Sequence, residues 1–267
     1  MPQLVICDID ATLVNEKKEL TPRTKEALIK LHEKGIYFGI ASGRPVDELK
    51  RNKERWDLPF DFDFVMGMNG AELWDGVHQK FYSYFMMKKE WLKETMEIMN
   101  VVECNPMVYW KGKIRCVRID DWMIHSASTS HKELEIVRLE DLCANENAKI
   151  MFRMKEEDMS KAEAWVKEHP NPYYHGFKTQ TTLLEFCDKR INKGYGLQKI
   201  CELNDMDLKD VMAFGDTSND NEMLKVAGCG VCMINGTDDT KACANAITTY
   251  DNDHDGLAIY LEESEIV

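Results

Sequence analysis

The sequence predicts an α/β fold, in which a parallel sheet is covered by helices and a smaller α+β domain is inserted. Three apolar segments, LVICDID, IYFGIASGRP and VMAFGDTSND, each lead into a polar loop and then a helical pattern. Their apolar runs are continuous, which is typical of strands buried on both faces of a parallel sheet. With 267 residues and 44% hydrophobic content, the chain can form one large domain or two modest ones.

The segment after the first strand, TPRTKEALIKLHEKG, predicts a helix. Thr21 can cap it, Pro22 suits its first turn and Gly35 can end it. Near the carboxyl end, NDNEMLKVAG indicates another helix, GVCMI and AITTY indicate short strands, and DNDHDG indicates a turn into a closing helix. We therefore expect residues 1–80 and 190–267 to form one discontinuous domain.

Residues 81–189 have an alternating, aromatic-rich pattern instead. PMVYW and IRCVRI on either side of KGK predict a hairpin, and AKIMFRM, YYHGF and TLLEF predict further strands. KKEWLKETMEIMN and EEDMSKAEAWVKEHP predict two helices. The expected inserted domain is thus a small open sheet backed by two helices.

Composition and charge limit the classes of partner. A formal net charge of −13 disfavours nucleic acid and anionic membranes, because polyanions are repelled at long range. We find neither an apolar run of membrane-spanning length nor a secretory signal pattern, and nine scattered cysteines suit a reducing compartment. These features predict a cytoplasmic protein without nucleic-acid or membrane partners.

Acidic side chains follow two of the predicted strands. Asp8 and Asp10 are two residues apart in extended chain, so their side chains leave the same face with α-carbons about 6.5 Å apart. Asp216 follows a later strand, and the carboxyl ends of parallel strands meet at one edge. Such a cluster needs a compensating cation, and hard oxygen ligands suit Mg²⁺. The alternative is that these are solvated loop carboxylates.

Positive and hydroxyl groups follow strands at the same edge. Ser42 offers a hydroxyl group, Gly43 an accessible backbone NH and Arg44 a guanidinium group. Lys193 precedes a predicted helix. Each alone could be a surface or turn residue, but together they describe a phosphate site.

Four segments in order, DIDATL, ASGRP, INKG and GDTSNDNEML, resemble the four motifs of the haloacid dehalogenase superfamily, specifically its Cof-type phosphatases with a C2B-like cap. MNGA and LLEF extend the resemblance. It implies a Rossmann-like catalytic core and makes residues 81–189 the cap domain, inserted between the second and third motifs.

The resemblance also implies catalytic roles. Asp8 would attack phosphorus and become an aspartyl phosphate, while Asp10 would protonate the leaving oxygen and later activate water. Mg²⁺ would be held by Asp8, the backbone carbonyl of Asp10 and Asp216. Ser42 and Lys193 would hold the phosphoryl oxygens.

Supporting roles are implied for five further residues. Asn219 would lie beside the phosphate or the metal, and Asp220 would orient the lysine or a metal-bound water. Arg44 and Asn69 would lie on the substrate side of the pocket, and Thr12 would orient a carboxylate.

The function that the resemblance implies is Mg²⁺-dependent hydrolysis of a small phosphorylated metabolite, such as a sugar phosphate. A sugar phosphomutase of similar fold is disfavoured by the compact GDTSND segment. A non-catalytic phosphometabolite-binding regulator is disfavoured by Asp10, because binding alone needs no acid-base group. The substrate, the cap residues that select it and the oligomeric state stay open.

Ala11 departs from the family, which usually has glycine at this position. Alanine at positive φ costs on the order of 1 kcal/mol. We therefore predict that Ala11 has negative φ and that its methyl group faces the domain opening rather than the metal.

Overall fold

The first apolar run of the chain forms β1 (Leu4–Asp8), a strand of five buried residues in the computed structural model, which describes all 267 residues. β1 lies between β12 (Val211–Gly215) and β2 (Tyr37–Ala41), and its pairing with both strands is parallel. The predicted parallel-sheet core is therefore confirmed.

The sheet that contains β1 has eight strands in the order β14-β13-β12-β1-β2-β3-β4-β5. Pairing is parallel from β14 to β3, and β4 is antiparallel to β3. The other strands of this sheet are β3 (Phe64–Gly67), β4 (Glu72–Asp75), β5 (Lys80–Ser83), β13 (Cys229–Cys232) and β14 (Ala246–Ile247). Its helices and 3-10 turns are α1 (Pro22–Glu33), α2 (Val46–Leu49), α3 (Asn52–Arg55), η1 (Met68–Gly70), α8 (Lys193–Leu203), η2 (Leu208–Asp210), η3 (Ser218–Asp220), α9 (Asn221–Val226), α10 (Asp238–Cys243), η4 (Asn252–His254) and α11 (Gly256–Glu263).

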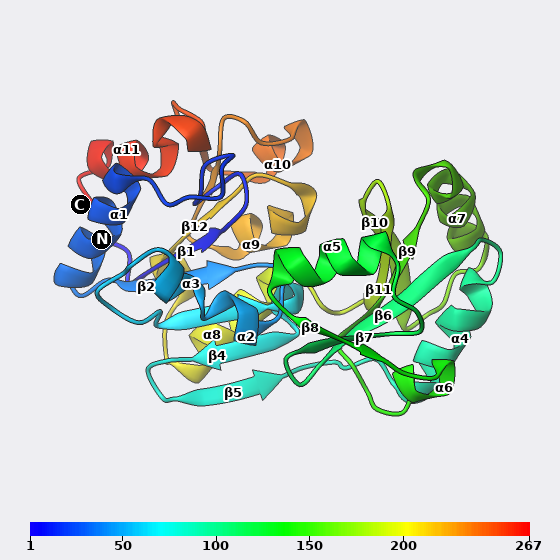
Figure 1. Cartoon of the computed structure of the whole chain (residues 1–267). Coiled ribbons are helices and arrows are strands. Elements are labelled where there is room, and N and C mark those ends of the chain that lie inside the picture. The colour runs from blue at the N-terminus through cyan, green and yellow to red at the C-terminus, as the bar shows by residue number, and fades with distance from the viewer. The chain divides into compact units, whose positions relative to one another are not determined.

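Helix α1 shows how the sequence sets the layers of this sheet. The Thr21 hydroxyl accepts from the backbone NH of Thr24, and Pro22 is the first helical residue, as predicted. The apolar stripe of α1 packs against α11 and one face of the strands. Figure 1 shows α1 beside α11. Helices α8 and α9 contact β3, β4, β12 and β13 and provide further cover for the strands.

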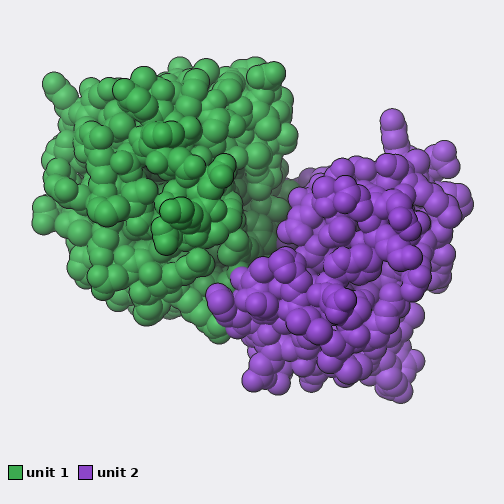
Figure 2. All heavy atoms as spheres, turned by 45° about the horizontal axis from the view of Figure 1, so that its top comes forward, with its two compact units in different colours: residues 1–82, 191–267 green, residues 83–190 purple.

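The chain divides into two compact units, which Figure 2 shows in different colours. Unit 1 consists of Met1–Tyr82 and Ile191–Val267 and holds the large sheet. Unit 2 is the intervening segment Ser83–Arg190, with a six-stranded sheet in the order β10-β11-β9-β6-β7-β8. No helix in the chain is both long enough and apolar enough to cross a membrane.

In unit 2 the strands are β6 (Cys104–Trp110), β7 (Lys113–Cys116), β8 (Glu133–Ile136), β9 (Lys149–Met154), β10 (Tyr174–Gln180) and β11 (Leu183–Asp188). Its helices are α4 (Lys89–Met99), α5 (Asp121–Ser130), α6 (Leu139–Leu142) and α7 (Glu156–Glu168). The predicted hairpin is present as β6 and β7, with Lys111 and Gly112 at positive φ in the turn. Helices α4 and α7 contact each other and share one apolar cluster with strand residues.

The sequence patterns did not reveal α5, β8 and α6, so this sheet is larger than expected. Helix α5 contains four serine or threonine residues, which have modest helix propensity. They also interrupt the spacing of apolar residues that would indicate a helix. Asp120 stabilises the start of α5 by accepting from the backbone NH of Met123 at 2.9 Å. His131 ends it in a left-handed conformation.

Candidate active site

The carboxyl ends of three neighbouring strands bring the first predicted residues together. Because β12, β1 and β2 are parallel neighbours, the chain leaves all three at the same edge of the sheet. Asp8 is the last residue of β1, and Ser42 and Asp216 directly follow β2 and β12. All three are buried, at the edge where ligands bind in open α/β folds.

Lys193, the first residue of α8, has none of its surface exposed. Its ammonium group donates to Asp8 Oδ1 and, at 2.5 Å, to Asp220 Oδ1. Asn192 caps α8 by accepting from the backbone NH of Tyr195 at 2.8 Å, which fixes where the helix begins. Burial acts to lower the pKa of Lys193, but the charges of Asp220 and Asp8 outweigh it and raise the pKa. The side chain is therefore an ammonium ion.

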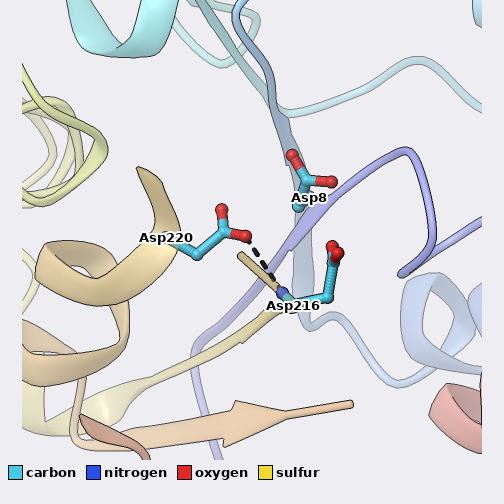
Figure 3. A group of neighbouring side chains, drawn as sticks. All are labelled: Asp8, Asp216 and Asp220. Carbon is cyan, nitrogen blue, oxygen red and sulfur yellow. Dashed lines mark hydrogen bonds between the residues drawn. The ribbon is translucent and has the colours of Figure 1, made fainter. Parts of the chain in front are cut away.

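Asp220 is held in place by the backbone. Its Oδ2 accepts from the backbone NH groups of Asp216 at 3.0 Å, shown in Figure 3, and Thr217 at 3.2 Å. Gly215 leaves room for this carboxylate, since a Cβ there would lie 2.5 Å from Asp220 Cγ. The other oxygen of Asp220 contacts Lys193, so this carboxylate fixes the direction of the ammonium group.

Asp8, Asp216 and Asp220 each offer one carboxylate oxygen, and these oxygens lie within 4.8 Å of one another (Figure 3). Burial raises the pKa of Asp216 to about 6, while a 2.8 Å hydrogen bond from Thr12 Oγ1 opposes the rise. Burial also raises the pKa of Asp8; Lys193 opposes that shift, and Asp220 and Asp216 reinforce it.

The charge balance of this cluster fits a divalent cation. The cluster has three buried carboxylates and one ammonium group, that of Lys193. Uncompensated negative charge is costly in the protein interior, where the polarity is low. Both oxygens of Asp220 already accept hydrogen bonds, from Lys193 and from the backbone. Asp8 and Asp216 therefore remain as the carboxylates best suited to Mg²⁺, which prefers hard oxygen ligands.

The carboxylate of Asp10 lies outside this buried cluster. Its side chain is 39% exposed and forms ion pairs with Lys18 at 2.9 Å and Arg44 at 3.0 Å. Burial acts to raise the pKa of Asp10, but Arg44 and Lys18 outweigh it, so the pKa falls below its ordinary value. Arg44 also contacts Glu48 at 3.4 Å.

The loops after β2, β3 and β12 meet around Asn69. Its backbone NH donates to the carbonyl of Ser42 at 3.0 Å, and its side-chain oxygen accepts from Asn219 Nδ2 at 3.3 Å. A Cβ at Gly43 would lie 3.4 Å from the same oxygen, which is ordinary van der Waals contact, so Asn69 lies directly beside the backbone of Gly43. Asn69 itself has φ +54, which asparagine tolerates better than most residues.

The prediction for Ala11 is wrong, because the residue has φ +60. The chain reverses directly after β1, where the backbone NH groups of Leu13 and Val14 both donate to the carbonyl of Ile9. The carbonyl of Ala11 also accepts from Asn235 Nδ2 at 2.8 Å. These contacts impose a left-handed turn despite the side chain.

Two residues at this site carried no recognisable signal in the sequence. Lys18 resembles any surface lysine of a charged loop, yet it pairs with Asp10. Asn235 lies far along the chain, yet it holds the turn at Ala11. Only the folded loops reveal these contacts.

The chain is similar to known proteins along nearly its whole length. The chain matches the haloacid dehalogenase-like hydrolase family over residues 5–261. It is 27% identical over 272 residues to the 5-amino-6-(5-phospho-D-ribitylamino)uracil phosphatase YitU of Bacillus subtilis (strain 168), covering 98% of this chain and 97% of the relative. A second B. subtilis phosphatase with the same named substrate, YcsE, is 26% identical over 260 residues, covering 96% and 93%.

The fold also matches a solved structure along its length. A haloacid dehalogenase-like hydrolase from Bacteroides thetaiotaomicron superposes with a TM-score of 0.88 at 25% identity, covering 99% of this chain and 100% of the other. The family match spans both segments of unit 1 and all of unit 2. The resemblance drawn from the four motifs is confirmed, and the chain belongs to the haloacid dehalogenase-like hydrolases.

Proposed function

We propose that the protein is a Mg²⁺-dependent phosphatase, which hydrolyses a small phosphorylated metabolite through an aspartyl-phosphate intermediate. The observation that carries the proposal is the buried contact of Lys193 with Asp8 and Asp220, beside Asp216. A carboxylate next to a fixed ammonium group and a cation site can approach a phosphate without prohibitive repulsion.

The proposed reaction has two displacements at phosphorus. Asp10 enters the reaction with a proton taken from solvent, although its two ion pairs favour the carboxylate. Asp8 attacks the phosphoryl group, the bond to the leaving oxygen breaks, and Asp10 gives that oxygen its proton. Asp10, now ionised, takes a proton from water, and the resulting hydroxide attacks the phosphorus of the aspartyl phosphate. Inorganic phosphate leaves and both aspartates return to their starting states.

Mg²⁺ would be held by the carboxylates of Asp8 and Asp216 and the backbone carbonyl of Asp10. When bound, the ion would neutralise charge on the phosphoryl oxygens. Thr12 orients Asp216 through its hydrogen bond. Asp220 orients Lys193 in the same way.

Phosphate binding is assigned to groups around the same strand ends. Ser42, the backbone NH of Gly43 and Lys193 would bind the transferring phosphoryl oxygens. Asn219 and Asn69, which contact each other, would lie beside them. Arg44 would lie on the side of the leaving group, next to the acid-base residue that it contacts.

We further propose that unit 1 is the catalytic core and that unit 2 is a cap domain that selects the substrate. A sugar phosphate or a related phosphorylated polyol is the substrate class we favour. The two B. subtilis relatives are named for a phosphoribityl substrate, which is the first compound to test. Nine free cysteines are consistent with a reducing compartment such as the cytoplasm.

Phosphate release by the purified protein tests the proposal. A panel of phosphorylated sugars, polyols and nucleotides, together with an activated nitrophenyl phosphate, is assayed with Mg²⁺ and with a chelator. We expect turnover only with the metal, and Asp8→Asn to lower kcat by a factor on the order of 10³ or more. The exposed Asp238→Asn is the matched control and should keep full activity.

Two results would contradict the proposal. If no member of the panel releases phosphate, the phosphatase function is refuted. If Asp8→Asn folds normally and stays active, Asp8 is not the nucleophile.

A further inference from the structure

Each oxygen of the Asp10 carboxylate has a cation of its own. Oδ1 pairs with the Lys18 ammonium group at 2.9 Å, and Oδ2 pairs with the Arg44 guanidinium group at 3.0 Å. The Asp10 side chain is 39% exposed, so packing alone does not fix its direction. The Lys18 side chain is itself 49% exposed, so the two ion pairs together restrict where this carboxylate points.

Lys18 reaches Asp10 from a tight turn. Its backbone NH donates to the carbonyl of Asn15 at 2.9 Å, while Asn15 N donates to the carbonyl of Glu19 at 3.0 Å. The side chain of Asn15 also accepts from the backbone NH of Glu19 at 2.9 Å. Lys18 has φ +63, a conformation that costs a lysine about 1 kcal/mol. Glycine at position 18 would form this turn with less strain. The lysine found there instead places an ammonium group beside Asp10.

The loop that carries Lys18 is fixed from the carboxyl-terminal part of unit 1. Asn252 Nδ2 donates to the carbonyl of Val14 at 2.9 Å, and the backbone NH of Glu16 donates to Asp253 Oδ1 at 2.7 Å. Both anchor residues lie in η4, which is part of the DNDHDG segment. These two hydrogen bonds fix the loop immediately before the turn that carries Lys18. Less conformational entropy is therefore lost when Lys18 pairs with Asp10.

Arg44 alone would hold Asp10 less firmly. Its guanidinium group is shared with Glu48, at 3.4 Å, so its direction depends on two carboxylates. Lys18 contacts the opposite oxygen and so restricts rotation of the carboxylate. General acid catalysis requires such fixed geometry at the leaving oxygen.

We propose that Lys18 is a positioning residue, which holds the Asp10 carboxyl group in the direction needed to protonate the leaving oxygen. This role rests on the proposed phosphatase function. It assigns Lys18 no contact with the phosphoryl group.

Leaving-group dependence tests this role, with kcat/KM as the readout because it reports the steps up to formation of the aspartyl phosphate. Nitrophenyl phosphate has a leaving group that is stable as an anion and needs little protonation, whereas an alkyl phosphate such as a polyol phosphate needs a well-placed acid. Loss of the Lys18 cation would by itself favour the acid form of Asp10, so a loss of activity reports the direction of the carboxyl group and not its charge. We expect Lys18→Met to lower kcat/KM about 10- to 100-fold for the alkyl phosphate and by less than about threefold for nitrophenyl phosphate.

Three further variants complete the experiment. Lys18→Arg should restore most of the alkyl phosphate activity, because it keeps a cation. Lys18→Asn removes the charge while tolerating positive φ, so it should reproduce the effect of Lys18→Met without backbone strain. The neighbouring exposed Lys17→Met is the matched control and should act like the wild type.

An equal loss on both substrates, or no loss with either uncharged variant, would overturn the role of Lys18. A wild-type protein that hydrolyses neither phosphate ester would instead refute the phosphatase proposal itself, and this role with it.

Discussion

Ala11 holds a left-handed backbone at φ +60 in the turn that follows β1. Its Cβ strains this conformation by about 1 kcal/mol. Glycine would remove the strain but would also lose more entropy on folding. We expect Ala11→Gly to leave the free energy of unfolding unchanged or raise it by up to about 1 kcal/mol. Urea unfolding, followed by a probe of unit 1, measures the change.

The matched control is an alanine with ordinary helical backbone in the same unit. Ala242 is exposed in α10, so Ala242→Gly should lower the free energy of unfolding by about 1 kcal/mol. If Ala11→Gly destabilises the protein as much as this control, the left-handed turn does not strain Ala11.

Residues that follow strands were the easiest to identify from the sequence. Asp8, Ser42 and Asp216 were suggested because each comes directly after an apolar run and a parallel sheet brings such ends to one edge. The structure does place them there. Lys18 and Asn235 could not be found in this way, because their contacts depend on how two loops fold back over the sheet edge.

Helix α8 packs closely against η1 one turn after Lys193. Gly196 lies one turn after Lys193, and a Cβ there would meet Met66 Sδ at 2.7 Å and the Cα of Gly70 at 2.9 Å. We expect Gly196→Ala to displace the start of α8, to lower kcat and to lower the free energy of unfolding by about 1–3 kcal/mol.

Steady-state kinetics and denaturant unfolding check this variant. Gln198→Ala, in the same helix but only partly buried, is the control and should change neither quantity appreciably. If Gly196→Ala has wild-type kinetics and stability, the close contact of α8 with Met66 and Gly70 is not required for activity or folding.

Helices with clear caps and strands with continuous apolar runs were predictable as elements. Helix α1 has Thr21, Pro22 and an apolar stripe, and each has its expected role. The segment between β7 and β9 was not predictable, because α5 has few strong helix formers and depends on the capping contact of Asp120. Its existence follows from packing in unit 2 rather than from local preference.

At the scale of the whole molecule, the candidate site joins residues that are far apart in the chain. Asp8 and Lys193 are separated by 185 positions, with all of unit 2 between them. The site therefore forms only when both segments of unit 1 assemble. Four motifs in order could indicate the family, but the contacts between them had to come from the fold.

The buried acidic cluster should make the stability of the metal-free protein depend on pH. Burial raises the pKa of Asp216 from 3.8 to about 6, so the folded protein keeps a proton that the unfolded chain releases between these values. The folded state then binds more protons than the unfolded state, and stability falls as pH rises through this window. Asp8 shifts in the same direction.

A bound cation favours the ionised carboxylates and should therefore offset this loss. We expect millimolar Mg²⁺ to raise Tm more at about pH 7.5 than at about pH 5, because protons compete for the same oxygens at the lower pH. Thermal unfolding with MgCl₂ is compared with NaCl of equal ionic strength, and with the variant Asp216→Asn. Since that variant lacks a carboxylate at this position, its Tm should respond little to the metal. An equal rise at both pH values, or a full rise in Asp216→Asn, would mean that Mg²⁺ stabilises the protein at some other place than this cluster.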